Sequence, residues 1–467
     1  MITIDNNDTI CAISTPAGVG GIAVARVSGP LAITIADRIW RGKPLMNAAS
    51  HTAHLGFVTD PDNGETIDQG VATVFRTPGT FTGEDVVELS VHGSKFIQRE
   101  LIALLLRQGC RLAEPGEFTR RAYTSGRMDL TEAEAVADLI AASSRAAHRI
   151  ALSQMKGGFT RRLETLRGQL VELASLLELE LDFSEEDVEF ASRQRLKELA
   201  TAVSDEICRL ERSFATGHAI KEGIPVAIVG ETNVGKSSLL NTLVGDDRAI
   251  VSDVHGTTRD LIEDTVEIGD LLFRFIDTAG LRDTADTVEA MGIERSHAAT
   301  RRARVVMLVS DIARPLQTDL INETLTSMRD DASLIIVINK TDLTNPDTLS
   351  QIIAETAKRC QAAKAVVAIS ARNGSGIDTL KSALQHAAGA DQLAADQLLI
   401  TNARHSQALT RAAQSIARVI DGLDTSLSGD LIAQDLRETL HHLADITPAI
   451  TTPDLLATIF SRFCIGK

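Results

Sequence analysis

The sequence predicts a multidomain protein that combines α/β and all-α units: an α/β domain is inserted into a helical bundle, and another α/β domain precedes both. Three observations predict this class. The chain has 467 residues, too many for one hydrophobic core. Strand-like apolar runs alternate with helical intervals over about residues 222–384. Helical apolar stripes flank that region on both sides. The expected limits are 1–122, 123–220, 221–384 and 385–467, and the second and fourth segments form one helical domain.

The first domain, residues 1–122, mixes strand and helix patterns. The runs GIAVARVSG, GVATVFRT and DVVELSVHG are rich in β-branched residues, which favour strands. The run FIQRELIALLLRQG has the apolar spacing of an amphipathic helix. We therefore expect a compact α/β unit.

From about residue 131 the apolar residues recur at helical spacing. Two stripes are expected to face the core of a bundle. They are Leu163, Leu166, Leu170, Leu173 and Leu177, followed by Leu196, Leu199, Val203, Ile207, Leu210 and Phe214. The helical pattern resumes after residue 395 in QALTRAAQSIARVIDGL and DLLATIFSRF. The residues between are expected to be an insertion, since inserted domains occupy surface loops whose ends are close.

The inserted region contains five strand candidates separated by helical intervals: VAIVG, LLFRFID, RVVMLVSD, SLIIVINK and AVVAIS. Apolar strands that alternate with helices are typical of a mostly parallel sheet. This region is therefore expected to be an α/β domain.

Composition excludes several classes of protein. Apolar runs such as LIIVI fall far short of the roughly 20 residues that a membrane span needs. The N-terminus, MITIDNNDTICAIS, has no targeting pattern, so we expect a cytoplasmic protein. The five cysteines are scattered without C-x-x-C spacing, which argues against a disulfide framework or a zinc site.

The net charge of −16 disfavours direct binding of nucleic acid, and one Trp and one Tyr offer little surface for base stacking. Contact with RNA would need a local basic patch, for which Arg120, Arg121 and Arg127 are candidates, or a partner protein that makes most of the contact. We favour the partner protein.

Residues 230–237, GETNVGKS, match the phosphate-binding pattern G-x-x-x-x-G-K-S/T between the predicted strand VAIV and the helix SSLLNTLVG. In that setting Gly230 and Gly235 let the backbone bend around phosphates, and the loop amides and helix N-terminus supply partial positive charge. Lys236 is expected to reach the outer phosphates, and Ser237 to ligate Mg2+.

Further motifs follow in the order expected of a GTPase. DTAG places Asp277 near the Mg2+ shell and the Gly280 amide near the γ-phosphate. In NKTD the Asp342 carboxylate can accept from guanine N–H groups, so the nucleotide is expected to be GTP rather than ATP. GTTRD supplies Thr258 as a second Mg2+ ligand. The residues expected at GTP are Asn233, Val234, Gly235, Lys236, Ser237, Ser238, Ser252, Thr257, Thr258, Asp277, Thr278, Ala279, Gly280, Asn339, Lys340, Asp342, Ser370, Ala371 and Arg372.

One position departs from the pattern of Ras-like GTPases. A Gln after DTAG orients the attacking water in those proteins, but Leu281 stands here and cannot form a side-chain hydrogen bond. Another group must therefore orient the water. Asp283, Asp286 and Glu289 lie just downstream and are the candidates.

The chain ends in FCIGK, which places the Cys464 thiol fourth from the C-terminus. This cysteine is a lipid-attachment site, a reactive group or an inert residue. Prenylation is disfavoured because Gly466 is not aliphatic, Lys467 is outside the usual set of terminal residues and no polybasic stretch precedes them.

Several segments together resemble the MnmE (TrmE) family of tRNA-modifying GTPases. They are GETNVGKSSLLNTLVG, AIVSDVHGTTRD, DTAGLRDTADTVEAMGIERS, EPGEFTRRAYTSGRMDLTEAEAVADLI and FCIGK. The resemblance covers essentially the whole chain. It implies an N-terminal domain that binds folate and forms a homodimer, a split helical domain and an inserted GTPase domain.

The resemblance also implies a reaction. With a flavin-dependent partner of the MnmG family, which carries the FAD, the chain would add an aminomethyl or carboxymethylaminomethyl group to C5 of the wobble uridine of certain tRNAs. The carbon would come from a tetrahydrofolate derivative, 5-formyl or 5,10-methylene, and GTP hydrolysis would drive a conformational cycle.

At the GTP site the resemblance implies a bound K+ that neutralises charge on the transferring phosphoryl group, as an arginine would. Its ligands would be Asn233 and groups at Ser252, Val254 and Thr257. Glu289 matches the family residue that orients the water.

For folate, the resemblance implies contacts from Arg26, Glu88, Arg127 and Lys467. A carboxylate can accept from the pterin N–H groups, and arginines suit glutamyl carboxylates. Cys464 becomes a catalytic thiol, either a nucleophile or a proton carrier. The alternative function is a ribosome-assembly or regulatory GTPase switch, which would require neither FCIGK nor a folate domain.

Overall fold

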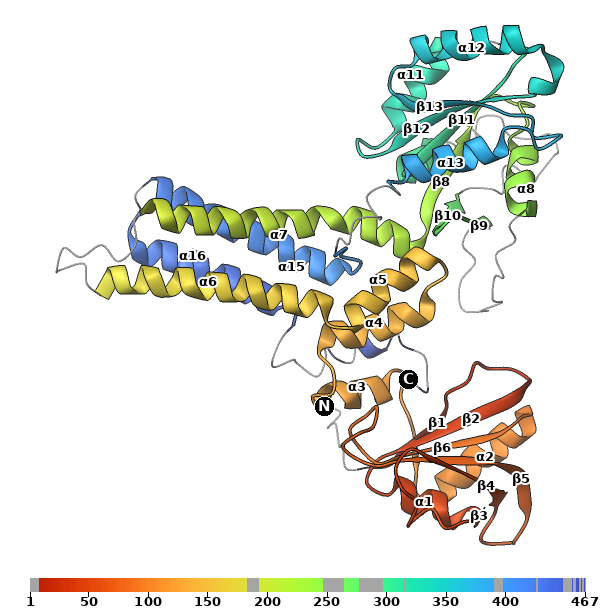
Figure 1. Cartoon of the computed structure of the whole chain (residues 1–467), viewed down its shortest axis with the longest axis vertical. Helices are drawn as coiled ribbons and strands as arrows, with labels where there is room; N and C mark the ends of the chain where they lie inside the picture. Colours follow the sequence, from red (N-terminus) through yellow and green to blue (C-terminus); the bar gives the residue numbers. More distant parts are fainter. Residues whose placement is uncertain are drawn as a thin grey trace. The chain divides into compact units, whose positions relative to one another are not determined.

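The computed structural model describes residues 8–182, 193–246, 264–276, 297–314, 316–389, 398–425 and 427–447, together with 456, 459–461, 463 and 466. The described residues fall into two compact units (Figure 1). The first lies within Met1–Ala137, Gln154–Glu164 and Leu443–Lys467, and the second within Asp138–Ser153 and Thr165–His442.

The first unit is built on a seven-stranded sheet of order β3-β4-β5-β6-β2-β1-β7. Neighbouring strands are antiparallel except β1 and β7, which are parallel. The strands are β1 (Ile10–Ile13), β2 (Gly20–Ser28), β3 (Trp40–Gly42), β4 (Thr52–Thr59), β5 (Thr66–Phe75), β6 (Val86–Gly93) and β7 (Arg111–Leu112). The predicted α/β class is confirmed here; β1, β3, β4 and β7 were not predicted, because they are short or half-exposed and lack a long apolar run.

The helices that begin in this unit are α1 (Ala32–Arg38), α2 (Lys95–Arg107), α3 (Glu117–Thr124) and α4 (Leu130–Ala141). Helix α2 begins at Ser94, whose side chain accepts a hydrogen bond from the amide of Phe96. One face of α2 buries Leu101, Leu104 and Leu105 in the same core as the strands. Apolar burial on that face is what holds the helix to the sheet.

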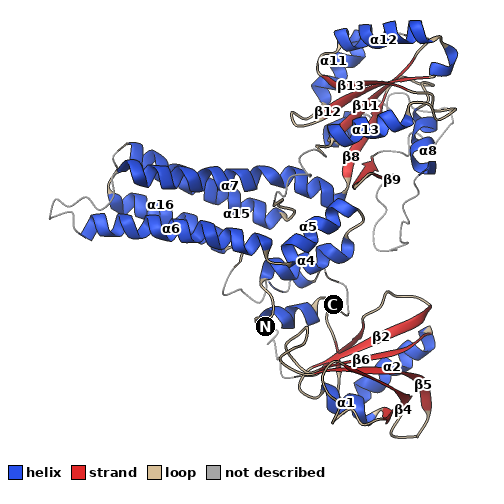
Figure 2. Cartoon of the chain, viewed as in Figure 1, coloured by secondary structure: helices blue, strands red, loops and turns tan. Residues whose placement is uncertain are grey.

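The described helices on either side of the inserted domain are the short α5 (Arg145–Met155) and the long α6 (Gly158–Asp182), α7 (Arg193–Glu222), α15 (Ala403–Asp424) and α16 (Gly429–Ala444). Figure 2 shows α6, α7, α15 and α16 as a bundle. The first predicted stripe is buried throughout. The second is wrong at Leu199 and Phe214, which are only half-buried. Buried Ala200 completes the alternating four- and three-residue spacing from Leu196 to Leu210, so Leu199 lies beside the core-facing stripe rather than within it.

The inserted domain contains a six-stranded sheet of order β13-β12-β11-β8-β10-β9. Its strands are β8 (Ile224–Val229), β9 (Asp264–Ile268), β10 (Leu271–Phe275), β11 (Val305–Asp311), β12 (Ser333–Asn339) and β13 (Ala363–Ala368). All five predicted strands are present and pair in parallel with one another, and the unpredicted β9 pairs antiparallel to β10. Strand β9 was missed because polar residues interrupt its short sequence, DTVEI.

Helices cover both faces of this sheet. Helices α8 (Lys236–Asp246) and α13 (Ile377–Ala387) pack into one core, and α11 (Thr318–Ser327) packs into the core on the other face. Helix α12 (Pro346–Arg359) accompanies the edge strand β13 (Figure 2). The domain lies between α7 and α15 in chain order, which confirms the predicted insertion, while the domain limits at residues 122, 220 and 384 stay predictions.

The carboxylate of Asp138 lies where the chain enters the inserted domain and where it leaves it. Asp138 forms an ion pair with Lys221 at 2.7 Å, and it accepts a hydrogen bond of 3.3 Å from the hydroxyl of Thr401. A cavity of about 160 Å³ lies here, lined by these residues and by alanines of α4 and α5. None of the described helices combines the length and the apolar character that a bilayer crossing requires.

Candidate functional site

The loop between β8 and α8 carries the predicted phosphate-binding motif, and its two glycines are required by its shape. Gly230 has φ +151°, and a Cβ there would lie 2.2 Å from the carbonyl oxygen of Val309. Gly235 has φ +97°, and its Cβ would lie 2.3 Å from Nδ2 of Asn339. A side chain at Gly230 would therefore collide with the backbone of β11, and one at Gly235 would collide with the side chain of Asn339 at the end of β12.

The Lys236 side chain lies along this loop. Its Nζ donates to the carbonyl oxygens of Gly230 at 2.6 Å and Glu231 at 2.7 Å. Burial lowers the pKa of Lys236, because a charged ammonium is poorly solvated there. The ammonium therefore lies beside the backbone that is expected to surround the phosphates, with half-buried Ser237 next to it at the start of α8.

Asn339, the last residue of β12, connects three of the predicted motifs. The side chain is 2% exposed. Its Nδ2 donates to the carbonyl of Val234 at 2.8 Å, and its Oδ1 accepts from the amides of Lys340 at 2.8 Å and Ala371 at 3.0 Å. One amide group thus joins the phosphate loop to the two loops expected to hold the base.

Lys340 and Asp342 complete the base side. Lys340 has φ +64°, and its Nζ contacts the carbonyl of Asn233 at 2.9 Å and the carboxylate of Asp311 at 2.6 Å. The Asp342 carboxylate is exposed and accepts a hydrogen bond of 2.6 Å from the hydroxyl of Ser370. Ser370 therefore orients a carboxylate that remains accessible to a ligand.

Asp311 is a supporting residue that the sequence analysis missed. Burial raises its pKa, but hydrogen bonds from Lys340 and from the amide of Ala313 outweigh burial, so the pKa of Asp311 is lowered. The position of Asp311 in the sequence could have indicated this role, because it ends the strand RVVMLVSD at the same sheet edge as the phosphate and base motifs. A charged residue at the carboxyl end of a parallel strand commonly faces the ligand crevice.

These loops lie at one edge of the sheet because β8, β11, β12 and β13 are parallel. The hydroxyl of Thr242 on α8 also donates to the carbonyl of Ala371 at 2.9 Å. The predicted residues that the structure gathers here are Asn233, Val234, Gly235, Lys236, Ser237, Ser238, Asn339, Lys340, Asp342, Ser370, Ala371 and Arg372. The predicted residues Ser252, Val254, Thr257, Thr258, Asp277, Thr278, Ala279, Gly280 and Glu289 lie outside the described residues.

In the first unit, Arg26 and Glu88 face each other across β2 and β6. Arg26 Nε and Nη2 contact Glu88 Oε1 at 2.9 and 2.8 Å. The guanidinium carbon lies 5.7 Å from the ring centre of Phe81 and 5.6 Å from that of Phe118. Arg127 is exposed and follows α3.

Gly466, near the C-terminus, contacts the same Arg26 side chain. The carbonyl of Gly466 accepts from Ser14 Oγ at 3.0 Å and from Arg26 Nη1 at 3.4 Å. The predicted site residues Cys464 and Lys467 lie outside the described residues.

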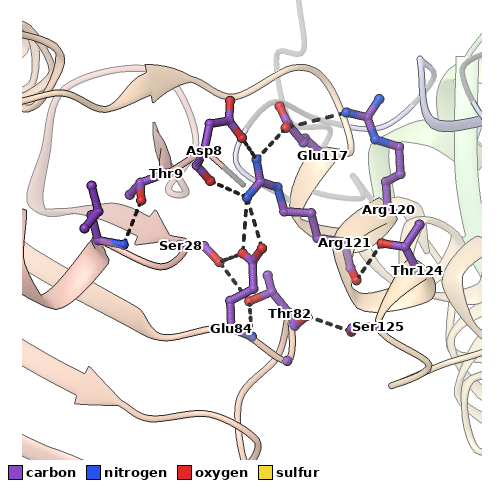
Figure 3. Close-up of polar contacts among 12 residues, drawn as sticks. Asp8, Thr9, Ser28, Thr82, Glu84, Glu117, Arg120, Arg121, Thr124 and Ser125 are labelled. Atoms are coloured by element: carbon purple, nitrogen blue, oxygen red, sulfur yellow. Dashed lines mark hydrogen bonds and ion pairs between the residues drawn. The ribbon is translucent and has the colours of Figure 1, made fainter. Parts of the chain in front are cut away.

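A buried ionic network lies at α3 (Figure 3). Arg121 is 2% exposed and contacts Glu84 and Glu117 at 3.1 Å each, and it also pairs with Asp8. Arg120 pairs with Glu114 at 2.9 Å, and its side chain is 12% exposed. Arg120 and Arg121 therefore do not form the basic patch that was the less favoured alternative for RNA contact, because both guanidinium groups are paired with carboxylates and mostly buried.

Two sequence profiles match the chain: the TrmE N-terminus, described as a GTP-binding protein, over residues 9–127, and the MnmE helical domain over residues 130–464. The tRNA modification GTPase MnmE of Parabacteroides distasonis is 50% identical over 98% of this chain and 100% of its own length. The chain belongs to the MnmE family. The Bacteroides fragilis member is 47% identical over 99% of this chain and 100% of its own.

Among solved structures, the elongation factor SelB of Methanococcus maripaludis matches 36% of this chain and 34% of its own, at 18% identity and a TM-score of 0.29. Membership of the MnmE family makes the chain an enzyme, a GTPase. The predicted phosphate-binding motif and its fold are accordingly those of a P-loop GTPase.

Proposed function

We propose that the chain hydrolyses GTP at the loops joined by Asn339, and that hydrolysis drives modification of C5 of the wobble uridine in certain tRNAs. The modification is an aminomethyl or carboxymethylaminomethyl group, made with a flavin-dependent partner of the MnmG family. The observation that carries the proposal is the single buried amide of Asn339, which fixes the phosphate loop against the base loops. A rigid cluster of this kind holds a nucleotide without reorganisation.

Lys236, Ser237, Asp342 and Ser370 each have a separate role in GTP binding. The loop amides and Lys236 contact the phosphates, and the exposed Asp342 carboxylate, oriented by Ser370, accepts from the guanine N–H groups. Ser237 supplies a hydroxyl oxygen, the kind of hard ligand that Mg2+ prefers, and Thr258 is proposed as its companion. When bound, the metal neutralises charge on the phosphates.

Asn233 has a left-handed backbone at φ +63° and lies exposed at the tip of the loop, where its amide oxygen suits K+. Ser252, Val254 and Thr257 are proposed to supply the other ligands, and Glu289 is proposed to orient the attacking water. A homodimer that brings two GTPase domains together would exclude water from this site.

The folate site is proposed at the Arg26–Glu88 pair. Both short contacts from Arg26 go to Oε1 of Glu88, so Oε2 can accept from a pterin N–H group. Arg127 and Lys467 are proposed to contact the glutamyl carboxylates of a 5-formyl or 5,10-methylene tetrahydrofolate. Cys464 is proposed as the catalytic thiol, either a nucleophile on the pyrimidine ring or a proton carrier.

A ribosome-assembly or regulatory switch is the alternative. It would use the GTP site equally well, but it has no use for an Arg26–Glu88 pair that contacts the C-terminal segment. We therefore favour the modification enzyme.

Replacing Cys464 with serine tests this function. We expect wobble-uridine modification to fall about 100-fold or more while GTP turnover stays at the wild-type rate, because the lost group acts on tRNA rather than on GTP. The measurement is mass spectrometry of tRNA nucleosides from cells that carry only the variant. Cys208→Ser, which changes a half-buried cysteine of α7, is the control. Normal modification by the Cys464 variant would contradict the proposed role.

The monovalent cation can be tested separately. GTP hydrolysis by the purified chain is expected to be at least about tenfold faster in K+ than in Na+ at equal ionic strength, because K+ stabilises charge that develops on the phosphoryl group. Phosphate release measured in both salts checks this. Equal rates would remove K+ from the mechanism.

A further inference from the structure

The described residues near the C-terminus are built into the first unit. Phe460 is 1% and Phe463 is 9% exposed, and both pack with Leu130 of α4. Gly116, with φ +67°, makes this close approach possible, since a Cβ there would lie 2.8 Å from the carbonyl oxygen of Phe460 and 2.9 Å from Cβ of Phe463. The segment is therefore anchored on the N-terminal side of Cys464.

A second anchor lies beyond Cys464, at buried Gly466. Its carbonyl oxygen accepts from Ser14 Oγ at 3.0 Å and from Arg26 Nη1 at 3.4 Å. The backbone of Gly466 is left-handed at φ +96°, and a Cβ would lie 2.4 Å from the carbonyl oxygen of Ile13. Only glycine can bring the chain this close to β1.

Both donors to Gly466 are themselves held in place. Arg26 is fixed by Glu88 and lies over two aromatic rings, as described above. Ser14 directly follows β1, and its own amide donates to the carbonyl of Val24 at 2.8 Å, which continues the pairing of β1 with β2. The two donors therefore present a preformed receptor for one carbonyl group.

We propose that Ser14 and Arg26 are positioning residues for the reaction at Cys464, acting by holding the carbonyl of Gly466. This rests on the proposed function, in which Cys464 is the acting thiol. Anchors at Phe463 and Gly466 leave only two residues between them, so little chain entropy remains to be lost when the thiol meets its substrate. Ser14 contributes to turnover although it touches no reacting atom.

The test uses the full-length protein and three variants: Ser14→Ala, Gly466→Ala and Thr15→Ala. Thr15→Ala is the matched control, because that hydroxyl accepts from the amide of Val24 within the β1–β2 connection. The first readout is the rate at which iodoacetamide alkylates Cys464, followed by peptide mass spectrometry with Cys208 as internal reference. The second is kcat and KM for tRNA modification with the partner protein. Urea unfolding followed by the fluorescence of Trp40 verifies that each variant is folded.

We expect alkylation of Cys464 to become about fivefold faster in Ser14→Ala, the effect of losing one hydrogen bond, and at least about tenfold faster in Gly466→Ala. We expect kcat for modification to fall while KM for tRNA stays unchanged, and Thr15→Ala to match the wild type. Unchanged alkylation in both variants would overturn the anchor. Faster alkylation with unchanged kcat would overturn the positioning role. The proposed function itself would be overturned only if the Cys464→Ser variant modified the wobble uridine normally.

Discussion

Replacement of Lys236 with alanine is expected to lower the rate of GTP hydrolysis at least about 100-fold, the typical cost of losing one charged donor at a developing negative charge. The Lys236 ammonium lies within 2.7 Å of the carbonyls of Gly230 and Glu231, whereas the Lys340 ammonium contacts this loop at the carbonyl of Asn233. Phosphate release at saturating GTP measures the effect.

Lys364→Ala is the matched control, since this exposed lysine of β13 belongs to the same domain. It is expected to hydrolyse GTP at the wild-type rate. If the Lys236 variant also kept the wild-type rate, the loop between β8 and α8 would not be the site of hydrolysis.

Replacement of Arg121 with methionine is expected to destabilise the first unit by about 3–5 kcal/mol, because it leaves buried carboxylates without their cation. Glu117 is 1% exposed, and Glu84 and Asp8 share the same guanidinium (Figure 3). Trp40 is the only tryptophan of the chain and is 4% exposed in this unit, so its fluorescence during urea unfolding reports the change.

Arg99→Met is the control, because the Arg99 side chain is 72% exposed in its pair with Glu100. Exposed pairs contribute about 0–1 kcal/mol. Equal unfolding midpoints for the Arg121 and Arg99 variants would show that the buried network does not stabilise the fold.

The same network makes stability depend on pH. Burial raises the pKa of Glu117, but hydrogen bonds from Arg111, the amide of Glu114 and Arg121 outweigh it, so the pKa lies below the ordinary value of 4.5. The pKa of Asp8 is lowered from 3.8 in the same way by Arg111 and Arg121. A lowered carboxylate pKa stabilises the fold fully above the ordinary value and loses that effect as the pH falls below it. The difference in unfolding midpoint between wild type and Arg121→Met should therefore shrink below about pH 4.5.

The sequence could place the described phosphate and base loops at one edge of the sheet, because each of these motifs is contiguous and directly follows a strongly apolar strand. The parallel arrangement then brings the loops together without further information. Asp311 was missed because it lies outside those motifs, although it ends the strand between β8 and β12 and contacts Lys340.

Contacts between residues that lie far apart in the sequence could not be predicted from it. Arg121 reaches Asp8 across 113 positions and Ser14 reaches Gly466 across 452, and no local pattern indicates either contact. For that reason Arg120 and Arg121 could be considered for a basic surface patch, although a partner protein was favoured, and no role was predicted for Ser14. Strand β7, with two residues, is likewise formed by pairing with β1 rather than by its own propensity.

The contact of Lys221 and Thr401 with one Asp138 carboxylate explains how the bundle tolerates the inserted domain. The two points where the polypeptide leaves and rejoins the bundle are spanned by a single side chain. The ends of the inserted domain are therefore held close together, and an insertion with close ends leaves the packing of α7 against α15 undisturbed.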